Sequence, residues 1–345
     1  MLNELGHIAV VFCSPKSQFL CRSGLHASQL VHAPIEKKRM VALFAMWKFV
    51  NSFEPDCVVT HSSTDAWIAA VVRYFSPRKF RLIRTRHVRA AVNDNVLTRW
   101  LYKQSDQTVT TSEDIAKYLS TKFKFLNGSI HSIQTGVNTD RFSPANKKRS
   151  REYNGQTKLS VESNILLMVS TLRSWKGHRE TLRAVRHLDE FRLWIVGDGP
   201  LETELKNLVS ELEISEKVIF WGFQQDVAEF FQKADLFLQP SLRHEGVSQS
   251  LLQAQASCLP VVASDIGGLN EIVEDGVTGR LIEPGSESAI LGAIREFRDA
   301  PNKFAAMAVQ ARLAVVRKHS EHVMLEKMIS VYEAGWSGSE KKVVE

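Results

Sequence analysis

The stretch from Asp235 to Glu271 reads DLFLQPSLRHEGVSQSLLQAQASCLPVVASDIGGLNE and decides the fold of this chain. Its first residues, Asp235–Gln239, form a short apolar run closed by Pro240, a pattern typical of a buried strand. Apolar residues then recur at helical spacing from Val247 to Ala254. Pro260–Ala263 reads as the next strand, so strand and helix alternate as they do around a parallel sheet.

The polar groups of this stretch gather where its two strands end. Glu245-Gly246 opens the first helix, and Gly267-Gly268 leads from the second strand towards a helix predicted to begin near Asn270. In an open α/β sheet, ligands bind at the carboxyl ends of strands, where helix N-termini offer free N–H groups to an anion. The sequence therefore predicts a phosphate-bearing ligand at this edge.

The rest of the chain continues the alternation. In the first half we predict strands at His7–Phe12, Asp56–Thr60, Phe80–Arg84 and Thr108–Thr110, and helices at Lys37–Val50, Thr64–Tyr74, Asn93–Lys103 and Ser112–Thr121. In the second half we predict strands at Ile165–Ser170, Arg192–Val196 and Lys217–Trp221, and helices at Gly177–His187, Leu201–Glu213, Val227–Ala234, Glu287–Phe297 and Lys303–Trp336. Residues 143–160 are polar and without periodicity, so we place the interdomain linker there.

Composition and charge set the class of protein. A chain of 345 residues with 44% hydrophobic and 24% charged residues is large enough for two ordinary globular domains. Its four cysteines lack the spacing of a metal site or a disulfide framework, so we expect a reduced, cytoplasmic protein. Residues 1–150 hold 22 Lys or Arg and 10 Asp or Glu, a net +12, whereas 151–345 hold 22 and 28, a net −6. The basic half indicates an anionic partner such as a membrane surface.

The same residues carry a family resemblance. The pattern P-S-x-x-x-E-G-x(6)-Q-A-x-A-x-x-x-P-V-V-A-S-D-x-G-G-x-x-E, from Pro240 to Glu271, resembles the signature of the retaining GT-B glycosyltransferases of the family 4 type, also called glycosyl transferases group 1. The resemblance implies two Rossmann-like, doubly wound domains facing a cleft: an acceptor-side domain over 1–150 and a donor domain over 151–320. A C-terminal helix and tail over 321–345 would pack back towards the first domain.

The resemblance also implies the activity. A sugar would move from a nucleotide-sugar to a glycan or lipid-linked acceptor with retained configuration, in bacterial lipopolysaccharide or surface-polysaccharide assembly. No metal and no cofactor are implied, because the nucleotide-sugar is a substrate. Nucleic acid is not an expected partner. The enzyme would be cytoplasmic, peripheral at the inner face of the plasma membrane.

Cations for the diphosphate are expected in Thr171–His178. This loop joins a strand to a helix, and Lys176-Gly177 matches the family's K-G landmark. The family's Arg position holds Thr171 here, so Arg173 is the available substitute. Lys176 and Arg173 would stabilise the charge that develops on the leaving diphosphate.

The other expected contacts follow from the signature. Glu245 would hold the transferred sugar, with the backbone N–H groups of Gly246, Val247 and Ser248 near the diphosphate. Gln253 stands where the family carries a second Glu; it keeps an acceptor oxygen for the ribose but loses the charge. Gln249 would also face the nucleoside, and the loop at Phe223 would face the base.

Two histidines follow strands of the first half. His87, in R-T-R-H, falls where family members often carry a His that faces the donor sugar. For His61 we favour an ordinary loop or core role.

The start of the chain departs from the family pattern. Leu5–Val11 resembles the step into the family's second strand, and no Gly-rich turn precedes it. We therefore expect the first strand and helix of the N-terminal domain to be absent.

Other readings stay open. A non-catalytic GT-B relative that only binds a nucleotide-sugar or a protein partner is suggested by Gln253 and Thr171. A nucleotide-sugar epimerase lacks support from the signature spacing. A nucleic-acid binder would explain the basic half, but we find no recognition motif with interleaved aromatic residues.

Overall fold

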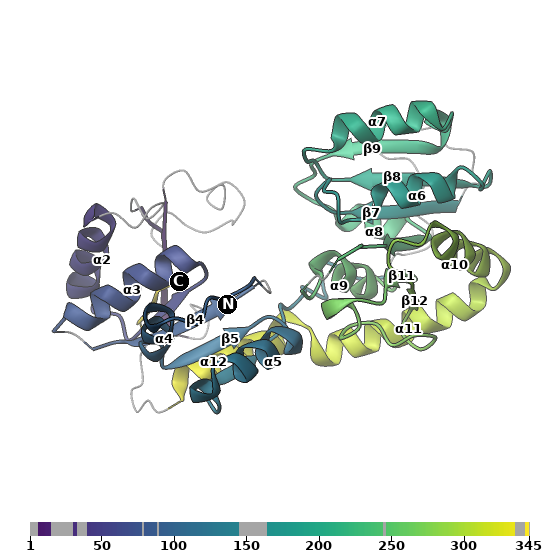
Figure 1. Cartoon of the computed structure of the whole chain (residues 1–345). Coiled ribbons are helices and arrows are strands. Elements are labelled where there is room, and N and C mark those ends of the chain that lie inside the picture. The colour runs from purple at the N-terminus through teal and green to yellow at the C-terminus, as the bar shows by residue number, and fades with distance from the viewer. Residues whose placement is uncertain are drawn as a thin grey trace. The chain divides into compact units, whose positions relative to one another are not determined.

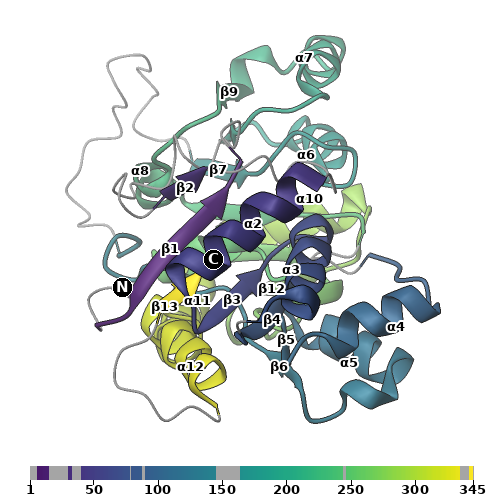
Figure 2. The same ribbon diagram turned by 90° about the vertical axis from the view of Figure 1, so that its left-hand side faces the viewer.

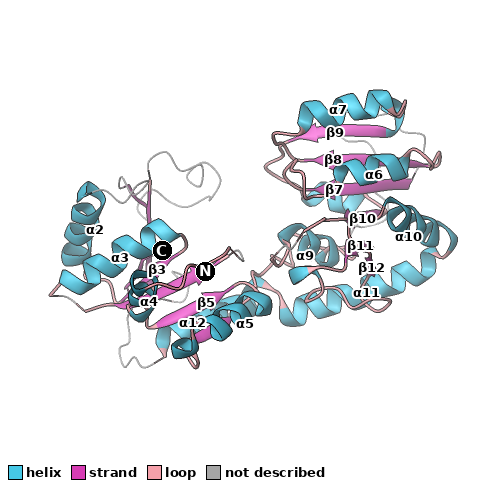
Figure 3. Cartoon of the chain, in the orientation of Figure 1, coloured by secondary structure: helices cyan, strands magenta, loops and turns pink. Residues whose placement is uncertain are grey.

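The chain forms two compact α/β units in the computed structural model (Figures 1 and 3). The first unit comprises Met1–Gln134 and Leu325–Glu345, and the second comprises Thr135–Met324. The residues that the structure describes are 6–14, 30–32, 40–77, 79–87, 90–144, 164–243, 246–334 and 342–344.

The first unit is built on a seven-stranded sheet with the order β2-β1-β13-β3-β4-β5-β6, in which all neighbours pair in parallel. Its strands are β1 (Ile8–Cys13), β2 (Leu30–His32), β3 (Cys57–Thr60), β4 (Arg81–Arg86), β5 (Gln107–Thr110), β6 (Ile130–Ser132) and β13 (Lys342–Val344). Figure 2 shows the yellow β13 beside the strands of this unit. β13 thus lies between β3 and the strand predicted at His7–Phe12, although β13 comes about 330 residues later in the sequence than that strand.

Helices follow most strands of this sheet. They are α2 (Met40–Phe53), α3 (Ser63–Phe75), α4 (Val96–Lys103), α5 (Glu113–Lys122), the 3₁₀ turn η3 (Lys124–Leu126) and α12 (Glu321–Glu333), which begins in the second unit. Helix α3 begins at a capping box, in which the side chains of Ser62 and Asp65 each accept a hydrogen bond from the other's backbone N–H. Its buried Ile68 and Ala69 pack against Val58 and Leu82 of the sheet.

The second unit is built on a six-stranded parallel sheet with the order β12-β11-β10-β7-β8-β9. Its strands are β7 (Asn164–Val169), β8 (Phe191–Val196), β9 (Val218–Gly222), β10 (Leu236–Gln239), β11 (Val261–Ser264) and β12 (Arg280–Ile282). Its helices are α6 (His178–Val185), α7 (Glu202–Glu211), α8 (Ala228–Lys233), α9 (Gln249–Ala256), α10 (Glu287–Asp299) and α11 (Pro301–Lys318), with 3₁₀ turns η4 (Ser215–Lys217) and η5 (Gly267–Leu269).

This sheet is buried on both faces. Along β7, Leu166 and Met168 belong to one hydrophobic cluster, whereas Ile165 and Leu167 belong to another. Successive side chains of a strand point to opposite faces, so the two clusters lie on opposite sides of the sheet. An apolar run without polar alternation is the pattern expected of a doubly wound parallel sheet. The predicted α/β class is confirmed for both units.

Two predicted helices differ from the structure. The helix expected near Asn270 is replaced by η5, turns and the short strand β12. The helix expected over Lys303–Trp336 is broken into α11 and α12. The break occurs because the carbonyl of His319 accepts from the N–H of Val137 at 2.8 Å, and the N–H of Glu321 donates to the carbonyl of Val137 at 3.0 Å.

The boundary between the units lies at Gln134 rather than at residue 150. Residues after 134 belong to the second unit, where Phe142 packs edge-on against Phe231 with a centroid distance of 5.9 Å. The guanidinium of Arg312 also donates to the carbonyls of Thr139 and Phe142. Of the linker predicted over 143–160, only its first two residues lie among those described. Residues 325–345 join the first unit.

Candidate functional site

The candidate donor site is the carboxyl edge of the second unit's sheet. Loops leave this edge after β7, β8, β10 and β11, and β7 and β10 are neighbours at the centre of the sheet. The carboxyl ends of parallel strands meet at one edge, so these loops come together. The predicted residues Arg173, Lys176 and Gly246–Ser248 all lie in them.

The loops after β7 and β10 are joined through their backbones. The N–H of Leu242 donates to the carbonyl of Trp175 at 2.8 Å. Gly177 has φ +77° and lies so close to Pro240 that a Cβ atom would stand 1.9 Å from the Pro240 carbonyl oxygen. Only glycine fits this left-handed, crowded position. The loop carrying Lys176 is thereby fixed beside the loop that leads to Glu245.

The loop after β8 is fixed to the same place. Leu172 donates its N–H to the carbonyl of Asp198 at 2.8 Å, and the N–H of Leu201 donates to the carbonyl of Leu172 at 3.2 Å. The sequence G-D-G-P at 197–200 therefore forms a turn that is hydrogen-bonded to the β7 loop and leads into α7. Backbone hydrogen bonds and close contacts at glycines hold these three loops together.

Two cations stand on the β7 loop. The N–H of Lys176 donates to the carbonyl of Arg173 at 3.1 Å, closing a turn that places both side chains on one short segment. Lys176 is half-buried, whereas Arg173 is exposed, with its guanidinium carbon 5.6 Å from the centre of the Trp175 ring. A paired Lys and Arg at a strand end is suited to binding a diphosphate.

His178 follows these cations in the sequence and is the first residue of α6. It is buried, and its Nε2 lies 3.2 Å from the hydroxyl of Ser170. Burial lowers the pKa of His178 to about 4, helped by the positive charges of Lys176 and Arg179. The imidazole is therefore uncharged at neutral pH and adds no third cation. The motifs in the sequence do not single out this residue.

The helix after β10 begins at a satisfied cap. The hydroxyl of Ser248 accepts from the N–H of Leu251 at 3.4 Å and donates to the buried side-chain carbonyl of Gln239 at 3.3 Å. Gly246 and Val247 pass against Gly268, where a Cβ atom would meet their backbone at 2.6–2.7 Å. The N-terminus of α9 is thus packed against the loop after β11. Glu245 lies outside the described residues.

The residues predicted to contact the nucleoside and its base lie on two separate elements, with Gln249 and Gln253 on α9 and Phe223 after β9. The side-chain amide of Gln249 donates to the carbonyl of Gly136 at 3.0 Å, so that donor is already used within the unit. Gln253 is half-buried one turn further along α9. Phe223 follows β9, the edge strand two positions from β7, and its side chain is 47% exposed. The structure does not place Phe223 beside the two cations.

In the first unit, His87 and His61 form a pair. They follow the neighbouring strands β4 and β3, and His61 Nδ1 lies 3.1 Å from His87 Nε2 with the rings stacked. The N–H of His61 donates to the carboxylate of Asp65 at 2.9 Å. Partial burial lowers the pKa of His87, and His61 lowers it further, while Asp65 opposes the shift. His61 therefore has a defined partner, which a reading of its own strand alone did not reveal.

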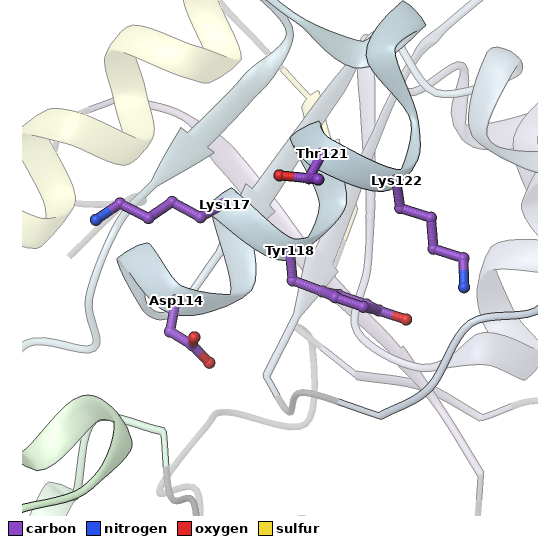
Figure 4. Close-up of a pocket in the computed structure, with 5 residues that line it drawn as sticks. All are labelled: Asp114, Lys117, Tyr118, Thr121 and Lys122. Carbon is purple, nitrogen blue, oxygen red and sulfur yellow. The ribbon is translucent and has the colours of Figure 1, made fainter.

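A shallow pocket of about 340 Å³ lies elsewhere, along α5 of the first unit (Figure 4). It is lined by Asp114, Lys117, Tyr118, Thr121 and Lys122. The phenol oxygen of Tyr118 accepts from the N–H of Val92 at 3.1 Å, which lowers the pKa of Tyr118. All five residues come from one helix, and no strand-end loop contributes.

Within the described ranges, no three His, Cys, Asp or Glu side chains gather in a way that could hold a metal ion. None of the helices described there is long and apolar enough to cross a membrane.

Two families match the sequence. Residues 1–141 match the family described as Glycosyltransferase Family 4, and residues 150–314 match the family described as Glycosyl transferases group 1. The second match contains both the β7 loop and the stretch from Asp235 to Glu271.

Curated relatives agree with these matches. EpsD of Bacillus subtilis, a putative glycosyltransferase, is 28% identical over 323 residues, which cover 88% of this chain and 82% of EpsD. AmsK of Erwinia amylovora, an amylovoran biosynthesis glycosyltransferase, is 28% identical over 179 residues, which cover 49% of this chain and 44% of AmsK. Further relatives are matched over 45–55% of their own length.

The fold is also found in solved structures. Anabaena HepE in complex with UDP-glucose superposes with a TM-score of 0.76 at 17% identity, covering 95% of this chain and all of HepE. The solved structures show the GT-B fold, and the two family matches and the relatives show that this chain belongs to the glycosyltransferases of the group 1, family 4 type.

Proposed function

We propose that this glycosyltransferase moves a sugar from a nucleotide-sugar to a glycan or lipid-linked acceptor with retention of configuration and without a metal ion or cofactor. One observation carries the proposal: the Trp175–Leu242 hydrogen bond and the Gly177–Pro240 contact hold the β7 loop, which carries Lys176, against the start of the loop after β10. The stretch that resembles the family signature begins at Pro240 in that second loop.

The diphosphate would bind to Lys176, Arg173 and the N-terminus of α9. The two cations offset its negative charge, and the unpaired N–H groups of the first helical turn add donors. Because His178 is uncharged at neutral pH, it adds no positive charge to those of Lys176 and Arg173. The solved complex of HepE with UDP-glucose supports a nucleotide-sugar as the donor class.

The sugar would leave as the bond between its anomeric carbon and the diphosphate oxygen breaks. The acceptor hydroxyl attacks the same face, its oxygen bonds to the anomeric carbon, and its proton passes to the departing phosphate oxygen. Glu245 would hold hydroxyls of the transferred sugar, and His87 would face that sugar from the first unit. Gln253 and Gln249 would serve the nucleoside side, and the Phe223 loop the base.

A panel of UDP-, GDP- and ADP-sugars tests the donor class. A specific donor should raise the melting temperature by mass action, and the others should not. NMR of the product should then show the donor's anomeric configuration, with turnover unchanged in EDTA. Inverted product or loss of turnover in EDTA would overturn the retaining, metal-independent proposal. Binding without turnover, across a broad acceptor panel, would favour the non-catalytic alternative.

We further propose that the first unit docks on an anionic membrane during surface-polysaccharide or lipopolysaccharide assembly, as a peripheral protein of the cytoplasmic face. Helix α2 supports this: Met40, Phe44 and Trp47 form an exposed apolar stripe, and the basic residues 37–39 precede it in sequence. An apolar face flanked by Lys and Arg is suited to an anionic interface. Amylovoran biosynthesis by the relative AmsK supports the polysaccharide setting.

Liposome co-sedimentation tests the docking. Binding should increase with anionic lipid, weaken with salt, and fall in a Phe44→Ser/Trp47→Ser variant. The matched control is Val309→Ser/Leu313→Ser, which removes exposed apolar side chains from α11 of the second unit. Binding that ignores lipid charge and salt, or that falls equally in both variants, would contradict the proposal.

A further inference from the structure

Gln239 is a buried amide at the carboxyl edge of the second unit. It is the last residue of β10, which lies between β7 and β11 in the sheet, and it is only 3% exposed. A buried side-chain amide has two N–H donors and an acceptor oxygen, and these groups need partners inside the protein. Gln239 finds hydrogen-bond partners at both ends of the loop that joins β10 to α9.

The amide nitrogen of Gln239 holds the first end of that loop. Its Nε2 donates to the hydroxyl of Ser241 at 3.2 Å, and Ser241 is fully buried. The next residue, Leu242, is the one whose N–H donates to the carbonyl of Trp175. The amide nitrogen therefore holds the point at which this loop is joined to the β7 loop with its two cations.

The amide oxygen of Gln239 holds the second end of the loop. Its Oε1 accepts from the hydroxyl of Ser248 at 3.3 Å and from the hydroxyl of Ser250 at 3.2 Å. The two hydroxyls also lie 3.1 Å from each other. Ser248 caps α9, and Ser250 lies in the first turn of that helix. The amide oxygen thus ties the N-terminus of α9 to the end of β10.

We infer that Gln239 is a positioning residue for the diphosphate of the donor, an inference that rests on the proposed function. There the diphosphate binds to the cations of the β7 loop and to the N-terminus of α9. One side chain connects these two parts, because Gln239 holds both the attachment point of the β7 loop and the first turn of α9. A binding site keeps its geometry when hydrogen bonds beneath it fix the groups that contact the ligand. Without this amide, the two parts would no longer be held in one arrangement.

Calorimetry with the full chain tests this role. UDP, GDP and ADP are titrated first, and the one that the wild type binds most tightly is used for the variants, together with inorganic pyrophosphate. Gln239→Met keeps a long, unbranched side chain but removes the donors and the acceptor. It should weaken binding of the nucleoside diphosphate about tenfold, because several positioning hydrogen bonds are lost together. Pyrophosphate should lose affinity by a similar factor, since Gln239 acts on the diphosphate part.

A second buried amide on α9 provides the matched control. Gln255 lies near the C-terminal end of the helix, and its side chain donates to the carbonyls of Ile272 and Thr278. Gln255→Met should lower stability but leave the affinity for the nucleoside diphosphate unchanged. Ser250→Ala removes one hydroxyl from Gln239 and should weaken binding about threefold. Ser250→Thr keeps that hydroxyl and should restore the affinity of the wild type.

The outcomes separate a positioning role from a loss of stability alone. Weaker binding in Gln239→Met and Ser250→Ala, with normal binding in Gln255→Met and Ser250→Thr, supports the inference. Equal losses in Gln239→Met and Gln255→Met, or a loss for the nucleoside diphosphate but not for pyrophosphate, would overturn it. Normal binding in Gln239→Met while Lys176→Ala binds weakly would overturn it and leave the proposed donor site intact.

Two further results are also decisive. If the wild type binds none of the three nucleoside diphosphates, the proposed donor class fails, and the inference fails with it. If Gln239→Met does not fold, the comparison of Ser250→Ala with Ser250→Thr decides, and equal affinities in those two variants would overturn the inference.

Discussion

The two parallel sheets of this chain hold their strand ends together in different ways. In the second unit, backbone hydrogen bonds and glycine contacts join three loops, and one of these loops carries the cations Lys176 and Arg173. In the first unit, the strand ends meet through side chains, with His61 bonded to His87 and Asp65 bonded to the backbone of His61. Even the centre of that sheet depends on β13.

The difference indicates a division of labour. A rigid, backbone-built edge suits a ligand part common to many donors, such as a diphosphate, because preorganised groups need no rearrangement on binding. A side-chain-built edge can differ between relatives without breaking the fold, which suits an acceptor.

The largest effect is expected from Gly177→Ala. A Cβ atom would meet the Pro240 carbonyl at 1.9 Å, and alanine disfavours φ +77°. The left-handed conformation alone costs about 1–2 kcal/mol, and the clash with backbone should bring the loss of unfolding free energy to about 4 kcal/mol or more. Urea unfolding measures it.

Gly276→Ala is the matched control for that substitution. Gly276 has φ +73° but nothing within 4 Å of the added Cβ, so only the conformational cost should appear. Equal destabilisation by the two substitutions would mean that the joined loops of the second unit are not as crowded as described.

Lys176→Ala should act on the reaction rather than on the fold. Loss of one charge-stabilising group typically lowers kcat about 10²–10³-fold. Steady-state kinetics with the true substrate pair gives the number, and circular dichroism checks the fold. Lys206→Ala removes a surface cation paired with Glu202 in the same unit and should leave turnover unchanged. Near-normal turnover in Lys176→Ala would break the donor-site assignment.

Acid should destabilise the second unit through His178. Its pKa of about 4 in the folded unit lies below its ordinary value of 6.5, so the unfolded chain binds the proton first. Stability is therefore complete above pH 6.5 and falls as the pH drops from 6.5 towards 4, by about 3 kcal/mol in all. His178→Gln should flatten this pH dependence, whereas His187→Gln, at an exposed position, should not. Parallel profiles for all three proteins would contradict the buried, uncharged imidazole.

The smallest effect is expected from His61→Ala. This change removes a neighbour that lowers the pKa of His87, so that pKa should rise. NMR titration of the His87 ring protons measures the shift. His131→Ala, on β6 and bonded to Gln107, is the control that should leave His87 unchanged. An unaltered His87 titration in His61→Ala would show that the two imidazoles do not interact as described.

Sequence patterns identified most strands of the second unit because their residues are almost continuously apolar. Gly197 after β8 and Pro240 after β10 also mark where two of these strands end. Strands of three residues, such as β12 and β13, carry no periodicity of their own and form through their neighbours. The contact of Gln249 with Gly136, 113 residues away, and the pairing of His61 with His87 likewise depend on the fold.

Hydrogen exchange with and without bound nucleoside diphosphate tests whether the strand-end loops of the second unit bind the donor. We predict that amides of residues 171–177 and 246–249 exchange more slowly when the diphosphate of the preferred donor is present, and that Lys176→Ala loses this protection. The strands β3 and β5 of the first unit should exchange at unchanged rates. Protection centred on the first unit, with none in the loop that carries Lys176, would contradict it.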